Sequence, residues 1–523
     1  MDATQLLAQA ADIAADPAGL MPARQQMALS LGWHIILACF GVAFPAIIFV
    51  MHLRGIRKND PVALGLAKRW GKVSAVLFAI GAVSGTVLSF EMGMLWPGLM
   101  GTFGDVLGLP FAFEGLAFFL EAIFLGIYLY GWGRMPPKLH LLMVVPMAIT
   151  GVVGTYCVLA VNAWMNAPTG FDIVAGEVVN IEPWAVLFNQ HVLLAFAHMW
   201  LAAYMVAGFS IAAVYAVGML KGRRDRHHRL GFLVPFAFAT IAALAQPFAG
   251  HFLGHDLAER QPAKLAAFEF ADETADGATP LTIGGVYIDG EVKWAIEIPY
   301  LSSVASLNSF TEPVPGLDQV AEEDLPPVNF THYSFQTMIA LGFLLLGTVL
   351  LYWVMRWWRK VDLLDNKWFL RLTAATGVLA VTAMEAGWIA TEVGRQPWIV
   401  YGVMRTTEAA ADHTGVLWFV YGGSVVLYGG MTVGAIVVLR SMARRWRKGA
   451  ADLPSPYGPQ LAADGPAEVR DCADEQSATA QGMNENDAAA KAAPGSDAAA
   501  KTAPKSDAAA HGATVHSGEE TAR

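Results

Sequence analysis

The chain has 523 residues, of which 55% are hydrophobic and only 15% are charged, and its formal net charge is −10. Soluble globular chains carry about 25% charged residues. The composition therefore excludes an ordinary soluble protein and indicates that much of the surface faces lipid. The acidic charge balance also gives no reason to expect a nucleic acid partner.

The N-terminus and the cysteines exclude two further classes. The first residues, MDATQLLAQAADIAADP, are acidic and lack the basic region of a cleavable signal peptide. We therefore expect the first apolar segment to remain in the mature protein. The three cysteines, Cys39, Cys157 and Cys472, are widely spaced and predict neither a disulfide framework nor a cysteine-rich metal site.

Nine segments are long and apolar enough to cross a membrane, which takes roughly 20 mostly apolar residues. In chain order they are 27–51, 73–97, 112–132, 139–163, 187–218, 230–250, 332–355, 368–391 and 415–439. The sequence therefore predicts an all-α membrane protein with nine transmembrane helices.

The segments that connect the spans alternate in charge. Lysine and arginine gather after spans 1, 3, 5, 7 and 9, most densely in KGRRDRHHR at 221–229. The other connections are poor in both residues. Because basic loops stay in the cytoplasm, we expect the N-terminus outside the cell and the C-terminus in the cytoplasm.

This topology divides the chain into four parts. Residues 1–251 hold transmembrane helices 1–6, and residues 332–440 hold helices 7–9. Between them, 252–331 form an acidic loop on the outer side. Residues 441–523 repeat Ala, Asp, Lys, Pro and Ser, a composition that cannot bury a core, so we expect a disordered cytoplasmic tail.

Six ionisable or metal-ligating residues fall inside these spans, and the topology places all six in the outer half of the membrane. They are His34, Glu114, Glu121, His198, Met338 and Glu385. A charged side chain at the bilayer centre costs roughly 3 kcal/mol on insertion scales, so such residues usually serve a function. His, Met and carboxylate side chains are also ligands that haem iron accepts.

Each of these residues also has a structural interpretation. A lone methionine in a span usually packs against its neighbours, and a lone histidine often donates a hydrogen bond to another helix. His191 precedes His198 by two turns and is a further candidate ligand. His52 and His140 lie at cytoplasmic ends of spans, where we expect contact with water.

Longer motifs point to a known family. In chain order they are RQQMALSLGWH (24–34), WGK (70–72), EGLAFFLE (114–121), VNAWM (161–165), HMWLAAY (198–204), QPAKLAAFE (261–269), FQTMIALGFLL (335–345) and EAGWIATEVGRQPW (385–398). Together, over about residues 22–440, they resemble subunit I of cytochrome bd-type quinol oxidases. GRQPW and KLAAFE are the most specific of them. The loop length is similar to that of the short-loop branch of this family.

The resemblance implies a quinol:O2 oxidoreductase of the respiratory chain. Quinol would be oxidised at the outer face and O2 reduced to water with protons from the cytoplasm. Charge separation would then follow without a pump. The resemblance also implies a multi-pass protein of the bacterial cytoplasmic (inner) membrane, with a second membrane subunit of similar size, a possible small accessory subunit, and ubiquinol or menaquinol as substrate.

The resemblance also implies three haems: two haem b and one haem d, or a third haem b in its place. His198 and Met338 match the two axial ligands of the low-spin haem. His34 and Glu385 match the single axial ligands of the two high-spin haems, without an assignment of which serves which. Arg24 and Arg395 match cationic partners of haem propionates, since an Arg fork suits a carboxylate.

Other matched positions concern quinol and protons. The loop 252–331 matches the quinol-binding loop, in which Lys264 would anchor a quinone oxygen and Glu269 would accept a proton. Glu114 and Glu121 match a carboxylate pair that carries protons or offsets haem charge, and Asn162 matches a polar residue of the same path.

The chain departs from the family pattern in ways that are similar to its cyanide-insensitive branch. Gln336 stands two residues before Met338 where many members carry Arg, so we expect a lower haem potential or a charge partner elsewhere. Glu91 adds a carboxylate to the stretch MGMLW (92–96). The spacing from Glu114 to Glu121 is one residue shorter than usual, which weakens the assignment of Glu114.

Two other functions remain open on the sequence alone. A transporter without a cofactor could use Glu114, Glu121 and Glu385 as a proton relay. A haem b electron carrier without O2 chemistry would need pairs of intramembrane histidines on facing helices, and the spans lack such pairs.

Overall fold

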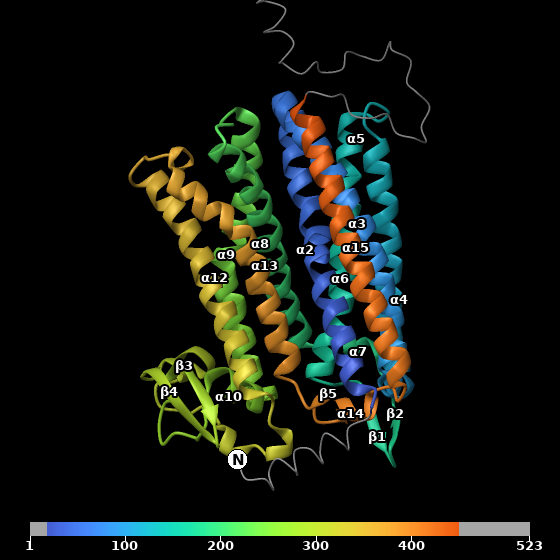
Figure 1. Cartoon of the computed structure of the whole chain (residues 1–523), viewed down its shortest axis with the longest axis vertical. Coiled ribbons are helices and arrows are strands. Elements are labelled where there is room, and N and C mark those ends of the chain that lie inside the picture. The colour runs from blue at the N-terminus through green and yellow to red at the C-terminus, as the bar shows by residue number, and fades with distance from the viewer. Residues whose placement is uncertain (1–17, 449–523) are drawn as a thin grey trace, which may run out of the picture. The chain divides into compact units, whose positions relative to one another are not determined.

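The computed structural model describes residues 18–448, and within them nine helical segments are long and apolar enough to cross a membrane. They are α2 (Leu20–Lys58), α3 (Pro61–Leu95), α4 (Pro97–Tyr130), α5 with α6 (Pro137–Leu142 and Val144–Asn166), α7 with α8 (Pro183–Leu187 and Gln190–Leu220), α9 (Arg226–Arg260), α12 (Val328–Trp357), α13 (Lys367–Val393) and α15 (Thr414–Arg447). Figure 1 shows them side by side as one bundle. The predicted nine-helix membrane fold is confirmed for this part of the chain.

Local sequence explains where several of these helices begin. The Asp60 side chain accepts a hydrogen bond from the Ala63 amide, and Pro61 occupies the first helical position of α3. Asn189, Asp225 and Asn366 cap α8, α9 and α13 in the same way. Such caps satisfy amide groups that have no partner within the helix.

One end of the bundle carries the basic connections, and we call it the basic end. Arg226, which begins α9, forms a two-pronged ion pair at 2.8 and 2.6 Å with Asp60, the residue before α3. Arg229 contacts Asp362, which follows α12, at 2.9 Å. Three connections that the sequence predicts on one side of the membrane therefore meet. Which side is the cytoplasm stays a prediction.

The opposite end, which we call the loop end, carries residues 261–327 between α9 and α12. This segment contains helix α10 (Pro262–Glu269), strands β3 (Leu281–Ile288) and β4 (Glu291–Ile298), helix α11 (Leu301–Leu307) and two short 3-10 turns, η1 (Leu317–Gln319) and η2 (Glu322–Asp324). His332 of α12 stacks on Phe270 with ring centroids 3.5 Å apart and hydrogen-bonds the Phe268 carbonyl, which fixes the end of α10 against α12.

Two smaller hairpins complete the loop end. Strands β1 (Asp172–Val174) and β2 (Glu177–Val179) follow α6, and β5 (Trp398–Val400) and β6 (Met404–Arg405) follow α13, leading to α14 (Thr406–Ala409). The three antiparallel hairpins of residues 18–448 are additions to the predicted all-α fold. Strands β1, β2, β5 and β6 have only two or three residues, too few for hydropathy analysis to find, whereas β3 and β4 have eight each.

Helix ends differ from the predicted span boundaries. Helix α9 continues to Arg260 and α12 begins at Val328, so the loop is shorter than the predicted 252–331. Helix α15 runs to Arg447, past the predicted boundary at 440. Hydropathy measures where side chains are apolar, whereas backbone hydrogen bonds continue through polar residues. The rest of the predicted tail, from 449, lies outside the described residues.

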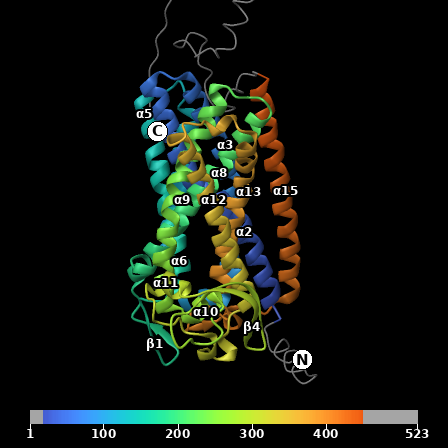
Figure 2. The same cartoon turned by 90° about the vertical axis from the view of Figure 1, so that its left-hand side faces the viewer.

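Helix α15 makes the thinnest contact with the bundle. It packs against α2 and α3, and its buried residues are Leu417, Ser424 and Tyr428. Figure 2 shows it along one edge of the bundle. The Tyr428 ring stacks on Trp33 of α2, with centroids 5.0 Å apart. Most of α15 therefore faces lipid or another protein.

Candidate functional site

His34 of α2 is directed at α3. Its Nδ1 atom lies 2.8 Å from the Ser84 hydroxyl, and a Cβ on Gly85 would lie only 3.0 Å from its Cε1. A hydrogen bond at one ring nitrogen orients an imidazole and leaves the other nitrogen for a metal. The hydrogen bond to Ser84 engages Nδ1, so Nε2 is the ring nitrogen that His34 could offer to a metal.

His198 of α8 is directed at α9. Its ring contacts the Gln246 amide at 3.2 and 3.3 Å, and a Cβ on Gly250 would lie 3.5 Å from its Cε1. Gln246 and Gly250 are four residues apart and share one face of α9. This face presents a polar group and a gap without a side chain to the histidine.

Met338 and Glu385 are both located at one short stretch of α13: Glu385 belongs to it, and Met338 contacts it from α12. Met338 of α12 packs on Gly387, where a Cβ would lie 2.6 Å from the Met338 Sδ. Glu385, two residues earlier, approaches α2, since a Cβ on Gly32 would lie 3.3 Å from its Oε2. The Glu385 Oε1 atom is buried and has no hydrogen-bond partner within residues 18–448.

The structure confirms only part of the expected common depth. His34, His198, Met338 and Glu385 all lie nearer the loop end of their helices than the basic end. Glu121 does not. Helix α4 begins at Pro97, well before the predicted span at 112, and Glu121 is nearer to its other end, Tyr130, which lies at the basic end. It packs instead beside Gly151 of α6, near the middle of the bundle.

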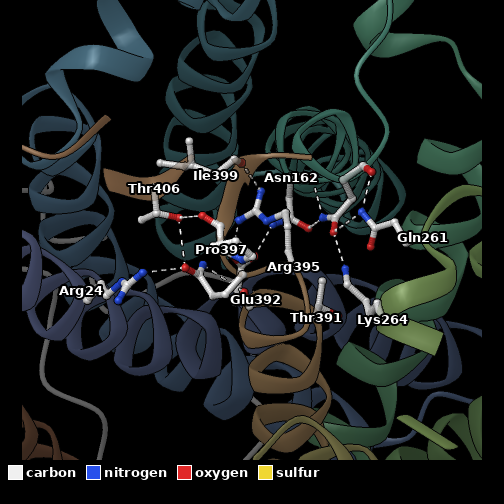
Figure 3. Close-up of polar contacts among 12 residues, drawn as sticks. Arg24, Asn162, Gln261, Lys264, Thr391, Glu392, Arg395, Pro397, Ile399 and Thr406 are labelled. Atoms are coloured by element: carbon white, nitrogen blue, oxygen red, sulfur yellow. Dashed lines mark hydrogen bonds and ion pairs between the residues drawn. The ribbon is translucent and has the colours of Figure 1, made fainter. Parts of the chain in front are cut away.

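A polar network joins the loop end of α13 to α6 (Figure 3). Asn162 of α6 donates a hydrogen bond to Glu392 of α13, and the Arg395 guanidinium lies 2.5 Å from the same carboxylate. Arg395 is 3% exposed and also donates to the Ile399 carbonyl at 2.8 Å. Arg395 is thus held as a buried cation beside a carboxylate and an amide.

Arg24 joins this network from α2. Its guanidinium donates to the Gln396 side chain at 2.9 Å, and the Thr406 hydroxyl donates to the same oxygen at 3.0 Å. Arg24 therefore contacts the GRQPW segment, which contains Arg395, the other arginine matched to a propionate partner.

Lys264 joins the network from α10. Its ammonium lies 2.6 Å from Asn166 Oδ1, and the Gln261 amide donates to the Asn166 carbonyl (Figure 3). Burial lowers the pKa of Lys264 well below its ordinary range, and the charge of Arg395 lowers it further, while Glu392 opposes the shift. The predicted loop residue is therefore coupled electrostatically to the α13 network.

Glu269 lies at the other end of α10 and takes a different direction. It is 4% exposed, and its Oε2 atom has no partner in the described part of the chain. Burial raises the pKa of Glu269 to about 7, although the nearby Ser302 hydroxyl of α11 opposes the shift. The structure thus does not bring Glu269 into contact with Lys264.

A cavity of about 400 Å³ opens beside the first turn of α10. Its lining includes Ala263 of α10, Gln319 of η1 and the GRQPW residues Gln396 and Trp398. Gly394, also in the lining, is close to Lys264, since a Cβ there would lie 2.8 Å from the lysine Cγ. The cavity and the buried lysine are neighbours.

Sequence reasoning missed Glu392. It follows Glu385 by seven residues and therefore shares its helix face, and it stands three residues before Arg395 in a motif that the resemblance already used. The seven-residue spacing was the available signal. Sequence reasoning also overlooked Asn166 and Gln246, whose partners are distant in sequence.

Two of the three departures from the family pattern, Gln336 and Glu91, have structural partners. The Gln336 side chain accepts from the Gly284 amide at 3.1 Å and donates to the Thr282 carbonyl at 2.6 Å, so it binds β3 to α12. Glu91, 1% exposed, accepts hydrogen bonds from Gln26 and Ser30 of α2. Gln26 also donates to Ser424, which ties α15 to this group.

The remaining intramembrane histidines are held by protein groups. His191 Nδ1 lies 2.6 Å from Asp256, which weakens its candidacy as a ligand. The expectation that His52 and His140 contact water is wrong, since they are 1% and 3% exposed. Both contact Tyr128, whose hydroxyl lies 3.3 Å from His52 Nδ1 and whose carbonyl lies 2.7 Å from His140 Nε2.

These observations fit haem rather than a packed protein interior. Buried polar atoms are normally hydrogen-bonded, yet Glu385 Oε1, Trp388 Nε1, Trp200 Nε1 and Arg395 Nε lack partners among the described residues. The first three lie on α8 and α13, which carry candidate ligands, and the fourth belongs to Arg395, a candidate propionate partner. The ligand types, His, Met and carboxylate, suit haem iron.

Known proteins match most of the chain. The model of the family described as cytochrome bd terminal oxidase subunit I matches residues 22–447. The putative cytochrome bd menaquinol oxidase subunit I of Bacillus subtilis is 35% identical over 425 residues, covering 78% of this chain and 95% of that protein. The cytochrome bd ubiquinol oxidase subunit 1 of the same species is 30% identical over 446 residues, covering 82% and 94%.

A solved structure agrees with these relatives. The bd oxidase from Geobacillus thermodenitrificans aligns with a TM-score of 0.78 and 38% sequence identity. The alignment covers 82% of this chain and 99% of that chain.

Proposed function

This chain belongs to the cytochrome bd terminal oxidase subunit I family, and we propose that it is the haem-bearing subunit of a membrane complex that oxidises quinol and reduces O2 to water. One observation carries the proposal furthest. The loop helix α10, through Lys264, and the helix α13, through Glu392, are joined by a polar network around Asn162, Asn166 and Arg395. This network couples a candidate quinol-binding loop to α13, the helix that carries the candidate haem ligand Glu385.

We assign the haem-binding residues from the family motifs that they match, and the intramembrane positions of these residues support the assignment. His198 and Met338 would hold the low-spin haem, and His34 and Glu385 one high-spin haem each. Bound haem would supply the electron path from quinol to O2. Arg24 and Arg395 would hold propionates, since each guanidinium is already fixed by its hydrogen bonds.

The two carboxylates of α13 make the Glu385 assignment testable. Glu385 has an unpartnered buried oxygen, whereas Glu392 is engaged by Asn162 and Arg395. We expect Glu385→Gln to lose one high-spin haem, measured by extracted-haem content and by the CO difference spectrum, and Glu392→Gln to keep three haems with slower quinol oxidation. The reverse pattern would transfer the ligand role to Glu392.

Quinol would bind at α10 with its ring in the 400 Å³ cavity next to Lys264. The low pKa of Lys264 lets it serve as a hydrogen-bonding group for a quinone oxygen without a full buried charge. Glu269, with a pKa of about 7, is poised to accept a proton near neutral pH. A proton acceptor must titrate near the operating pH, and burial provides this for Glu269.

Protons for O2 reduction would come from the basic end, which we assign to the cytoplasm. Glu114, Glu121 and Tyr128 are spaced by seven residues and share one face of α4. Tyr128 meets His52 and His140 at the basic end. This face would carry protons from the basic end into the bundle, and Asn162 of α6 would lie at the end of the path nearer the loop end. Taking protons from one side and releasing quinol protons on the other separates charge without a pump.

The complete enzyme would need further components. We propose two haem b and one haem d, or a third haem b, with ubiquinol or menaquinol as electron donor. A second membrane subunit and a possible small accessory subunit would cover part of the apolar surface, for which lipid-facing helices such as α15 provide area. The complex would reside in a bacterial cytoplasmic membrane with the loop end outside.

A spectroscopic and kinetic test decides the proposed function. Membranes carrying the intact complex should give a pyridine haemochrome spectrum and quinol-dependent O2 uptake, because the candidate ligands are of the types that haem iron accepts. A coloured complex without O2 uptake would instead support a haem b electron carrier. A colourless complex would favour a transporter that uses the intramembrane carboxylates.

A further inference from the structure

The β3–β4 hairpin presents apolar side chains that the rest of residues 18–448 leaves uncovered. Trp294 is 81% exposed and Ile296 is 68% exposed. Ile283 of β3 and Ile298 of β4 are also exposed. Solvent-facing strands outside a membrane normally carry polar residues, so this surface requires a partner.

Strand register places these residues on one face. Ile283 pairs with Ile296 across the hairpin, and Ile298 lies two residues further along β4. Side chains of paired residues, and of residues two apart, share a face of a sheet. The three isoleucines therefore form one apolar surface, and exposed Trp294, whose φ is +60°, precedes it on β4.

The remainder of the hairpin is anchored to the protein. Tyr287 and Val292, nearer the turn, pack against the loop core around α10, and the Val292 amide donates to Asp272 at 2.7 Å. Asn329 of α12 donates to the Tyr287 carbonyl and accepts from its amide. The hairpin is thus fixed in place, and its exposed face is not the result of a detached segment.

Hydrogen bonds determine the level of the hairpin along α12. Gln336 holds Thr282 and Gly284, and the Tyr333 hydroxyl donates to the Gly285 carbonyl. Gln336 and Tyr333 both lie inside the membrane-spanning helix α12, and Met338 follows two residues after Gln336. Figures 1 and 2 show the hairpin at the flank of the bundle beside the end of α12.

We propose that this apolar face lies on the phospholipid surface at the loop end of the membrane. The surface of α12 next to it is itself apolar and exposed, with Phe330, Tyr333 and Phe343 facing out. These residues are continuous with the lipid-facing side of a spanning helix. Tryptophan and tyrosine favour the interface between lipid and water, and isoleucine favours the acyl boundary.

The lipid contact would support the site. The hairpin holds Gln336 through two hydrogen bonds, and Gln336 is two residues from Met338. A hairpin seated on the bilayer therefore restrains the first turns of α12, where the proposed haem ligand lies.

Spin labels in the intact complex test this inference. Ile296→Cys and Ile283→Cys would be labelled in a Cys472→Ser background, since Cys39 and Cys157 are buried, and the complex placed in phosphatidylcholine nanodiscs. We expect labels at both positions to be more accessible to O2, which partitions into lipid, than to water-soluble Ni(II)-EDDA. Glu291→Cys, in the exposed turn of the same hairpin, is the matched control and should show the opposite preference.

Two outcomes would overturn the inference. A label at 296 that prefers Ni(II)-EDDA would mean that the face meets water. A label protected from both reagents would mean that another polypeptide covers it. Haem content equal to that of the unmodified complex would confirm that each variant is folded.

Discussion

Met338→Leu is expected to abolish the low-spin haem spectrum while the haems that bind CO remain. Leucine has nearly the volume of methionine, so α12 should still pack on α13, but leucine has no sulfur to ligate iron. Quinol oxidation should fall at least about 100-fold, since even partners one step removed from a metal change activity by 10–100-fold. Reduced-minus-oxidised and CO difference spectra measure the two effects separately.

A matched replacement on the same helix controls for packing. Met355 lies near the basic end of α12, away from the candidate ligand Met338. Met355→Leu should therefore leave both spectra unchanged. If Met338→Leu kept an unaltered low-spin spectrum, Met338 would be a packing residue and the partner of His198 would have to be sought elsewhere.

A second variant tests the same ligand through its surroundings. A Cβ at Gly387 would lie 2.6 Å from the Met338 sulfur, closer than atoms can approach, so Gly387→Ala must displace the thioether. We expect part of the low-spin signal to convert to high spin. Gly342→Ala on α12 is the control, because a Cβ there meets no atom within 4 Å in the described residues.

The number of spans could be predicted because its signals are local. An apolar stretch of sufficient length and a change in loop charge can both be read from neighbouring residues. The ends of α9 and α12 could not, because a helix continues through polar residues such as Glu259 and Arg260 when its backbone hydrogen bonds are satisfied. Hydropathy therefore defines the depth of apolar side chains rather than the length of the helix.

The candidate ligands could be predicted as residue types, but their surroundings could not. Glu392 meets Asn162 across 230 positions of sequence, and a single sequence gives no sign of such a contact. The same holds for Lys264 and Asn166. Sequence analysis could state that each candidate ligand is costly in a membrane, whereas only the fold shows which groups surround it.

Gln336 shows how an expectation changes once a missing element is known. Compared with the family pattern, Gln336 replaces an arginine near a haem, so the sequence analysis expects an electrostatic effect. In the structure the amide binds both a donor and an acceptor of β3, which an arginine, having no acceptor, could not do. The hairpin was not predicted, so this packing role had no basis in the sequence analysis.

Glu269→Gln is expected to slow quinol oxidation about 100-fold, the lower part of the range for a lost general base, with haem content unchanged. The variant should also lose a pH dependence that the native protein shows. Burial raises the pKa of Glu269 from its ordinary value of 4.5 to about 7. Below that pH the carboxyl is protonated and cannot accept a proton, so the native kcat/KM should rise with pH and level off above about 7.

The direction of this profile distinguishes a proton acceptor from a structural carboxylate. A carboxyl needed only in its protonated form would give a rate that falls through the same pH range, and Glu269→Gln, which mimics that form, would then retain activity. Glu273→Gln, an exposed position four residues further along, should leave rate and profile unchanged. Because kcat/KM reports groups of the free enzyme, the inflection near pH 7 should belong to Glu269 itself, and its persistence in Glu269→Gln would assign the proton acceptor to another residue.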